Sequence, residues 1–456
     1  MPHIVVLGGG FAGATITREL ERHFRRADDV HITLISRHNY MVFTPLLAEV
    51  AGNSIEPRHA VPPLRGFLSK ARFHEGEVRA VDLGARVVSV EHADGRVVAI
   101  PFHYLVIALG AVTNYQRAPG AADYSYDLKS LDDAIRLRNH VLATLELADV
   151  TADAAARRAL LTFVAAGGGY AGVEGLGQLV DFVRKALRFY PTIRPEELRF
   201  ILATRGAQLL EGIDDQLGRY VIRKLEDRGV EVRLGVKITE VTTATATLEP
   251  GGVLPTATVL WAAGIAVNPL LADVDVPKDK RGAIVVDRAL RVVGHPNVFA
   301  LGDCAAVPRG DGTTYAPTAQ NATREAVTAA RNLAATIRGG RLTAFHFSAL
   351  GSLATIGNYQ AVAQFGRVPF SGLPAWLAWR SVYLLKLPSF GRQLRVALDW
   401  VLEAILPTDI VQLPVRPSDD AVANAAAAGD LRVETPAPEP GHTEAPPAER
   451  ERGAGR

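Results

Sequence analysis

The sequence predicts an α/β fold with two Rossmann-like dinucleotide-binding domains, the second inserted in the first, and a C-terminal helical unit. Three observations lead to this prediction. Glycine-rich turns of one design lie at residues 8–13 and 167–172. Each follows a short apolar run, at residues 4–7 and 161–166, with the length and β-branching of a buried parallel strand. Each also opens an amphipathic segment, which completes the strand, turn and helix of a dinucleotide-binding unit.

The glycines of such a turn have separate roles. The first permits the tight bend, the second lets the backbone approach a pyrophosphate, and the third lets the helix pack on the strand. Because the design occurs twice, we expect one site for a bound flavin and another for an exchangeable nicotinamide nucleotide. The turn residues expected at the cofactors are Gly8, Gly10, Phe11, Ala12 and Gly13, and Gly167, Gly169, Tyr170 and Gly172.

Length and composition limit the class of protein. With 456 residues, 48% of them hydrophobic, the chain is long enough for two or three domains with proper cores. The formal net charge of +2 gives no reason to expect a nucleic acid as partner. The single cysteine, Cys304, excludes an intramolecular disulfide and thus a fold suited to an oxidising compartment. The first strand leaves no room for a signal peptide before it, and no apolar run approaches the ~20 residues of a spanning helix, so we expect a cytoplasmic protein.

The predicted elements repeat one plan. In the first half, a helix is expected to about Phe24, and the later strands are expected at residues 31–35 and 104–110. The second half begins at about residue 157, and its later strands are expected at residues 199–203 and 259–264. Short strands at residues 282–287 and 297–303 are expected to return to the first half. The predicted domains are a first part of the FAD-binding domain (1–115), a connecting segment (116–156), an NAD(P)H-binding domain (157–268), a second part of the FAD-binding domain (269–340), a C-terminal membrane-interface or dimerisation unit (341–415) and a disordered tail (416–456).

Further motifs extend over most of the chain, and they resemble one family. Besides the glycine turns, they lie at residues 39–47, 260–264, 300–305, 316–320 and 351–357. From about His3 to Leu413 the chain is similar to the type II NAD(P)H:quinone dehydrogenases, single-subunit flavoproteins with two dinucleotide domains. The resemblance implies ping-pong chemistry in a respiratory chain without proton pumping. NAD(P)H reduces a non-covalent FAD, and a membrane quinone then accepts two electrons.

Asp303 is a candidate flavin ligand. It follows a predicted strand, so its carboxylate is placed to accept hydrogen bonds from ribityl hydroxyls, and in the family the pair Gly302 and Asp303 has this role. A loop aspartate that caps a turn is the alternative. Cys304 has no partner cysteine and no nearby histidine, so we expect a small buried residue without a redox role. The other positions that we expect at the cofactors are Pro45, Ala108, Gly110, Ala263, Gly264, Ala319 and Gln320.

Three residues are candidates for catalysis. Glu174 is expected in the first turn of the second glycine-turn helix, where the helix dipole favours a carboxylate. The resemblance places it at the contact of flavin and nicotinamide, where it relays protons or orients the nicotinamide. Gln320 matches the first glutamine of a family signature beside the quinone site. The second glutamine is replaced by Arg324, which is expected on the same helix face. Its expected role is to stabilise a quinone oxyanion or the reduced flavin, and a structural ion pair is the alternative.

The residues after the second strand of each half bear on nucleotide choice. A fold that prefers an unphosphorylated ribose usually has an acid there, whereas this chain has Ser36 and Arg37 in the first half and Thr204 and Arg205 in the second. For FAD we expect Ser36 to bond a ribose hydroxyl and Arg37 to lie over the adenine. For the exchangeable nucleotide, the lack of a carboxylate beside Arg205 favours a 2′-phosphate, and NADPH use is a hypothesis. Arg205 pointing to solvent is the alternative.

Residues 373–406 are predicted to form two helices. In the second, Arg392, Arg395, Asp399 and Glu403 recur on one face, and apolar residues occupy the others. The combination of aromatic, apolar and cationic residues fits a helix lying in a membrane interface, which predicts a peripheral protein on the inner face of the cell membrane. Packing on the protein or on a homodimer partner is the alternative.

The predicted mechanism gives one further helix a role. A helix at residues 318–331 is expected to point its N-terminus at the flavin pyrimidine, where negative charge accumulates on reduction. Disulfide reductases and sulfide:quinone reductases need cysteines that this chain lacks. A soluble diaphorase, a ferredoxin-type reductase and a nicotinamide-sensing flavoprotein with little turnover stay open as alternatives.

Overall fold

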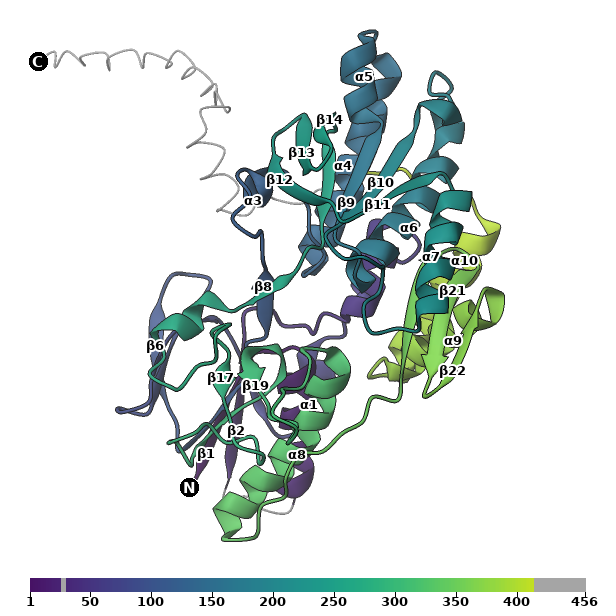
Figure 1. Ribbon diagram of the computed structural model, residues 1–456. Coiled ribbons are helices and arrows are strands. Elements are labelled where there is room, and N and C mark those ends of the chain that lie inside the picture. The colour runs from purple at the N-terminus through teal and green to yellow at the C-terminus, as the bar shows by residue number, and fades with distance from the viewer. Residues whose placement is uncertain (26–29, 414–456) are drawn as a thin grey trace, which may run out of the picture. The chain divides into compact units, whose positions relative to one another are not determined.

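A parallel five-stranded sheet forms the first half of the fold (Figure 1). The computed structural model describes residues 1–25 and 30–413. The strand order is β18 (Val298–Ala300), β7 (Tyr104–Ile107), β1 (His3–Leu7), β2 (His31–Ser36) and β3 (Arg72–Glu75). Its central strands are short, β-branched and buried, as a sheet with both faces covered requires. β18 comes from the chain after the second sheet, so the first domain is completed late in the sequence, as predicted.

A parallel four-stranded sheet forms the second half. Its order is β11 (Val230–Leu234), β10 (Arg199–Thr204), β9 (Thr162–Ala166) and β15 (Thr258–Trp261). The glycine turns follow the equivalent central strands β1 and β9. The predicted fold class, two Rossmann-like units with the second inserted in the first, is therefore confirmed.

One predicted strand pairs elsewhere. β17 (Ile284–Val285) pairs with β19 (Ala305–Ala306) and with no strand of the five-stranded sheet. The chain turns at Gly302–Cys304 directly after β18 and returns beside β17, which gives this two-residue strand a closer partner than the sheet.

Three helices position the sites. α1 (Phe11–His23) and α6 (Tyr170–Ala186) begin at the two glycine turns, and α8 (Ala319–Arg338) packs along α1 (Figure 1). α8 continues beyond the predicted end at residue 331 because its alanine-rich repeat runs on to Gly339, which ends the helix in a left-handed conformation.

A third unit follows α8. β20 (Gly351–Gly357), β21 (Gln360–Phe365) and β22 (Val368–Ser371) form an antiparallel sheet, which precedes α9 (Leu373–Lys386) and α10 (Phe390–Ile405). The two helices were predicted, but the sheet was not. Within residues 1–25 and 30–413, no helix is long and apolar enough to cross a bilayer. The tail predicted at residues 416–456 lies outside the described residues.

The remaining elements connect or cover these units. The helices are α2 (Leu47–Ala51), α3 (Ala121–Tyr124), α4 (Leu131–Val150), α5 (Ala154–Leu160) and α7 (Asp215–Asp227). The strands are β4 (Glu77–Asp82), β5 (Val87–Glu91), β6 (Val97–Pro101), β8 (Ala111–Thr113), β12 (Lys237–Val241), β13 (Thr245–Glu249), β14 (Gly252–Pro255) and β16 (Ile265–Val267).

Candidate functional site

The two glycine turns share one geometry. Gly8 and Gly167 have φ of 102° and 113°, a region that favours glycine, and a Cβ on either would collide with the backbone of the neighbouring strand end. A Cβ on Gly13 would collide with the carbonyl of Gly8, so the helix start lies directly against its own turn. Gly10, by contrast, faces open space. The turn therefore leaves backbone N–H groups accessible to a phosphate at the helix N-terminus.

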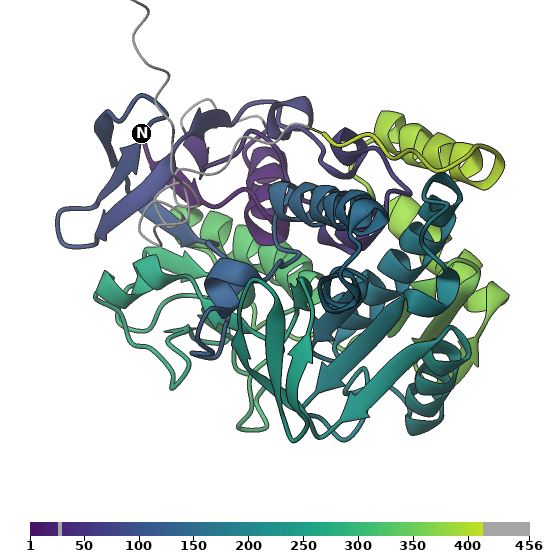
Figure 2. The same cartoon turned by 90° about the horizontal axis from the view of Figure 1, so that it is seen from above.

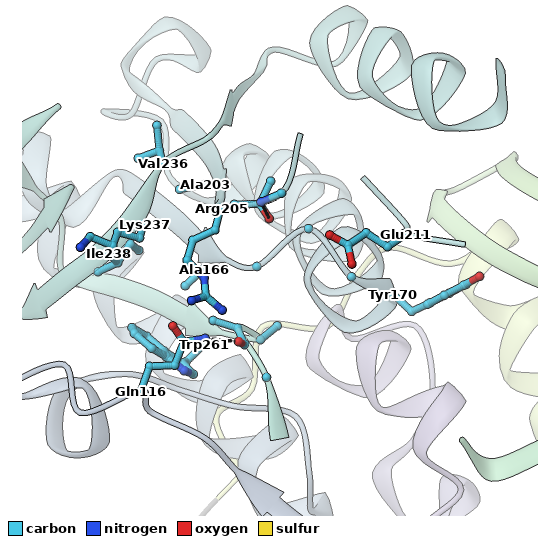
Figure 3. Close-up of a pocket in the computed structure, with 18 of the residues that line it drawn as sticks. Gln116, Ala166, Tyr170, Ala203, Arg205, Glu211, Val236, Lys237, Ile238 and Trp261 are labelled. Carbon is cyan, nitrogen blue, oxygen red and sulfur yellow. Dashed lines mark hydrogen bonds between the residues drawn. The ribbon is translucent and has the colours of Figure 1, made fainter. Parts of the chain in front are cut away.

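The second turn opens onto a cavity of about 510 Å³ (Figure 3). Gly169 again has nothing near the position of a Cβ, whereas a Cβ on Gly172 would collide with Gly167. The predicted residues that line the cavity are Gly167, Gly169, Tyr170, Thr204, Arg205, Ala263 and Gly264. Trp261, Gln116 and Lys237 line it as well and were not predicted. The cavity lies at the carboxyl ends of β9, β10 and β15, where open α/β sheets bind ligands.

Two charged side chains enter this cavity from the loop after β10. Arg205 is exposed and makes no ion pair within the described part of the chain, and Figure 3 shows its side chain turned into the cavity. Glu211 also lines the cavity, so the expectation that no carboxylate reaches this site is wrong. The loop folds back because Leu210 N–H donates to Gly168 O at 2.8 Å. Thr204 Oγ1 accepts from Gly206 N–H at 3.3 Å, within its own loop.

The loop after β18 meets the first glycine turn. A Cβ on Gly302 would lie 3.3 Å from Ala12 Cβ of α1 and 3.6 Å from Ala322 Cβ of α8. Glu325, a buried residue of α8 that sequence reasoning missed, accepts a hydrogen bond from Gly302 N–H at 2.7 Å. Asp303 is largely buried, which raises its pKa, and nearby Lys129 opposes this shift. Helices α1 and α8 therefore hold the Gly302–Asp303 loop beside the first turn.

The other residues predicted around the first turn gather at the same edge. Ser36 Oγ lies against Gly9, 2.6 Å from the position of a Cβ there, and the Ala108 carbonyl closes over Gly8. Arg37 is exposed, and its guanidinium lies 3.8 Å from Glu77 Oε1. The remaining predicted positions are the strand-end residue Gly110, Pro45 in a short 3₁₀ turn and Ala319 at the start of α8.

Cys304 is buried, and its thiol donates to the carbonyls of Ile107 and Leu301 at 3.6 and 3.4 Å. Burial raises the pKa of the thiol to about 11, so it stays protonated at neutral pH. The geometry fits the expected small buried residue.

Gln320 and Arg324 lie on one face of α8, as predicted. Gln320 Oε1 accepts a hydrogen bond from Leu350 N–H at 3.3 Å. The Arg324 guanidinium lies 5.5 Å from the centre of the Phe347 ring, and it makes no ion pair among the described residues. The structural ion pair that we considered for Arg324 is therefore absent there.

Glu174 lies deeper in its helix than predicted. α6 begins at Tyr170 and has no acidic residue in its first turn, so the expected stabilisation by the helix dipole is wrong. Glu174 is buried, and its Oε1 accepts from Thr355 N–H and from the indole Nε1–H of Trp379, each at 3.1 Å. Burial raises the pKa of Glu174 to about 8, so the carboxyl group is largely protonated at neutral pH.

A second buried carboxyl group, which sequence reasoning missed, belongs to Glu49 of α2. Its Oε2 accepts from Trp400 Nε1–H at 2.9 Å, and its Oε1 lies 3.9 Å from the Arg380 guanidinium. Burial is the largest influence and raises the pKa of Glu49 to about 7. Trp400 and Arg380 belong to α10 and α9, and only the folded arrangement brings them to α2.

α10 turns the acidic side chains of its polar face inward, whereas Arg395 on the same face is exposed. Asp399 Oδ2 lies 2.6 Å from His59 Nδ1, and Glu403 pairs with Lys185. The apolar face is exposed and includes Leu394, Leu398, Val401, Leu402 and Ile405, each with half or more of its surface accessible. Figure 2 shows α10, the yellow-green helix, at the periphery.

Comparison with known proteins places this arrangement among redox enzymes. A family described as pyridine nucleotide-disulphide oxidoreductase matches residues 2–326, and one described as NDH2 C-terminal domain matches residues 350–407. The pyridine nucleotide-disulphide oxidoreductase family uses a flavin and NAD(P)H. Both sheets and the C-terminal unit are therefore covered by these matches.

Relatives match nearly the whole length of the chain. The type II NADH:quinone oxidoreductase NdhA of Mycobacterium tuberculosis is 34% identical over 414 residues, with 87% of this chain and 86% of that protein covered. The demethylphylloquinone reductase NdbB of Synechocystis is 30% identical over 406 residues, with 88% and 96% covered. The structure of NDH2 from Plasmodium falciparum in complex with NADH has a TM-score of 0.82 at 21% identity and covers 90% of this chain and 99% of that one. The likeness to that structure establishes the fold.

Proposed function

Because this chain belongs to the type II NADH:quinone oxidoreductase family, we propose that it transfers two electrons from NAD(P)H, through a non-covalently bound FAD, to a membrane quinone. One observation carries the proposal. Helix α6 begins at the cavity of the second glycine turn and, one helical turn later, holds Glu174 against Trp379 of the C-terminal unit. A single helix thus connects the nicotinamide site to the part of the chain that distinguishes this family.

The first glycine turn and its surroundings suit FAD. Gly10 leaves room for a pyrophosphate at the start of α1, and the Gly302–Asp303 loop lies next to Ala12 of the same helix. We propose that Asp303 accepts hydrogen bonds from the ribityl chain and that Ser36 bonds the adenosine ribose. When bound, the isoalloxazine supplies hydride acceptance from NAD(P)H and two-electron donation to the quinone.

The protein contributes orientation and charge. The first turn of α8 has no acidic residue, and Thr318 Oγ1 caps the Asn321 N–H. The positive end of this helix is therefore suited to stabilise negative charge on the flavin pyrimidine. Gln320 in this first turn and Arg324 on the following turn are proposed to position the quinone carbonyls. Glu174 holds a proton at neutral pH and is proposed to release it as the quinone is reduced.

The nicotinamide site is proposed to accept NADPH as well as NADH. Arg205 is a cation in the cavity without an ionic partner in residues 1–25 and 30–413, and a 2′-phosphate would provide one. Glu211 opposes this preference because its carboxylate suits a free ribose hydroxyl and repels a phosphate. The balance of these two side chains sets the preference.

The exposed apolar face of α10, together with α9, is proposed to lie in a membrane interface. Apolar side chains that face outward while the polar side chains bond inward are suited to lipid. Residues 373–406 would then bring the site to its quinone on the inner face of the cell membrane, where NAD(P)H is available. A homodimer partner covering the same face is the competing arrangement.

Anaerobic reduction of the purified yellow protein tests the proposed function. NADH and NADPH, added separately, should bleach the flavin absorbance, and a short-chain quinone should then restore it. Acid precipitation should release all the colour into the supernatant. Bleaching without recovery on addition of quinone would contradict the proposed acceptor, and colour retained in the pellet would contradict non-covalent FAD.

A further inference from the structure

The proposed reaction needs one proton that the nicotinamide does not supply. Reduction of a quinone to a quinol takes two electrons and two protons, whereas NAD(P)H gives two electrons and one proton as a hydride. The second proton comes from the medium. If the quinone arrives from a bilayer beside α9 and α10, this second proton has to reach it through protein side chains.

Two buried carboxyl groups lie beneath neighbouring residues of α9. Trp379 donates to Glu174, and the next residue, Arg380, lies 3.9 Å from Glu49. The helices that carry the two carboxyl groups, α6 and α2, also pack on each other. A Cβ on Gly52, at the end of α2, would lie 2.7 Å from Gln178 of α6. The two carboxyl groups are therefore neighbours in one buried layer.

The surroundings of Glu49 suit a group that exchanges a proton. The charged groups around it are Arg380 on α9 and Asp399 and Glu403 on α10. Glu174 on α6 is close enough for the charge of Glu49 to raise its pKa. Arg380 is fixed between two indole rings, 4.0 Å from the Trp376 centroid and 4.6 Å from that of Trp400. Burial and the acidic neighbours raise the pKa of Glu49 to about 7, although Arg380 lowers it. Both protonation states are therefore accessible near neutral pH.

Helix α10, which carries Trp400, also connects this buried layer to solvent. Asp399 precedes Trp400, the donor to Glu49, and its carboxylate bonds His59 Nδ1 at 2.6 Å. The side chains of His59 and Asp399 are 17% and 14% exposed, so this pair lies where the buried layer meets water.

We propose that Glu49 holds the proton that reloads Glu174 during quinone reduction and is itself reloaded from the His59–Asp399 pair. This inference rests on the proposed quinone reductase function. In each turnover Glu174 gives its proton to the reduced quinone, the Glu49 carboxyl group passes its proton to the Glu174 carboxylate, and a solvent proton restores Glu49. Glu49 does not touch the quinone and acts only through Glu174.

The variant Glu49→Gln tests this route because the amide oxygen still accepts from Trp400, but the side chain cannot carry a proton. Anaerobic stopped-flow measurements should show flavin reduction by NAD(P)H within about twofold of the wild type, since that step takes no proton from the medium. Flavin reoxidation by a short-chain quinone should slow about tenfold or more. In the wild type, this second rate should fall as pH rises through about 7, where Glu49 loses its proton, and the variant should lack this fall.

Two further variants make the result interpretable. Glu49→Asp retains a titratable group and should recover part of the rate and its pH dependence. Glu21→Gln is the matched control, because Glu21 is also buried and accepts from Ser69, Lys70 and Ala71 far from this layer. It should leave both half-reactions unchanged. Equal slowing of both half-reactions in Glu49→Gln, or no slowing of either, would overturn the proposal.

An infrared titration separates this proposal from the proposed function. The carbonyl band of protonated carboxyl groups in the holoenzyme should lose a component near pH 7, and Glu49→Gln should lack that component. If the wild type does not reduce quinones but the component is present, the proposed function fails while the proton-holding role of Glu49 stands. An identical titration in wild type and variant would refute that role.

Discussion

The indole nitrogen of Trp379 lies 3.1 Å from Oε1 of Glu174, so the C-terminal unit donates a hydrogen bond to a carboxyl group of the second glycine-turn helix. Trp400 makes the equivalent contact to Glu49 at 2.9 Å. The helices α9 and α10 are therefore part of the buried core around the site. Deletion of residues 373–406 would remove both donors, and it is no clean test of membrane binding.

Replacement of Glu174 should change how stability depends on pH. The folded protein holds this proton with a pKa of about 8, whereas an unfolded glutamate releases it near pH 4.3. The free energy of unfolding of the wild type therefore falls as pH rises through this interval, because the folded state binds the additional proton. The Glu174→Gln variant has no proton to release at this position, so its free energy of unfolding should not show this fall.

Urea unfolding of wild type and Glu174→Gln at pH 6 and pH 8 measures the effect. Since each pKa unit corresponds to about 1.4 kcal/mol, the stability of the variant relative to the wild type should increase by roughly 2 kcal/mol between these pH values. A difference that is the same at both pH values would show that Glu174 does not titrate as its burial indicates.

Arg205→Glu should shift the preference from NADPH toward NADH. A charge-assisted bond to a 2′-phosphate is worth roughly 1.5–3 kcal/mol, so the ratio of the two kcat/KM values should move about tenfold or more. Arg219→Glu is the control, since Arg219 is exposed on α7, makes the same charge change and does not line the cavity. An unchanged ratio in Arg205→Glu would mean that Arg205 does not contact the nucleotide.

Glu211→Gln should move the same ratio in the opposite direction. Loss of this carboxylate removes a repulsion from the 2′-phosphate and an acceptor for the free ribose hydroxyl, so NADPH should gain and NADH should lose. Steady-state kinetics with both nucleotides provide the measurement. A gain for NADH would show that Glu211 lies away from the ribose.

Replacement of both Leu398 and Leu402 by Glu should abolish binding to lipid vesicles and leave flavin reduction by NAD(P)H intact. Both side chains are half exposed and make no part of the buried contacts of α10. Flotation with phosphatidylcholine–phosphatidylglycerol vesicles tests this. The matched control replaces Leu147 and Val150, which are exposed on α4, by Glu and should still float.

If the wild type itself does not float, the apolar face of α10 does not bind lipid. A change from dimer to monomer in the Leu398→Glu, Leu402→Glu variant, measured by light scattering, would then favour a second copy of the chain as its cover.

Glu325→Leu should weaken flavin binding. The substitution leaves the partly buried Gly302 N–H without its acceptor, which costs about 1–3 kcal/mol and loosens the loop that carries Asp303. The Kd for FAD, from the recovery of flavin fluorescence on dilution, should rise about tenfold. Glu325→Gln retains an acceptor and should stay near the wild type, and equal losses in both variants would contradict a role through Gly302.

The sequence by itself determined the parts that depend on local patterns. The glycine turns required Gly8 and Gly167 because the backbone there adopts a conformation that other residues resist, and the buried strands before them follow from their β-branched residues. The two C-terminal helices could be predicted in the same way, from the spacing of their polar and apolar residues. The same local information predicted that Asp303 directly follows a strand, because the apolar run of β18 ends just before it.

Only the tertiary structure decided which distant residues meet. The inward polar face of α10 depends on His59 and Lys185, which lie on other elements, so the amphipathic pattern alone did not tell which face is exposed. The approach of Glu211 to the nucleotide cavity depends on a loop that folds back onto the glycine turn. The raised pKa values of Glu174 and Glu49 depend on burial beneath α9 and α10. Burial and long-range hydrogen bonds arise from the packing of the whole chain, and no local sequence pattern encodes them.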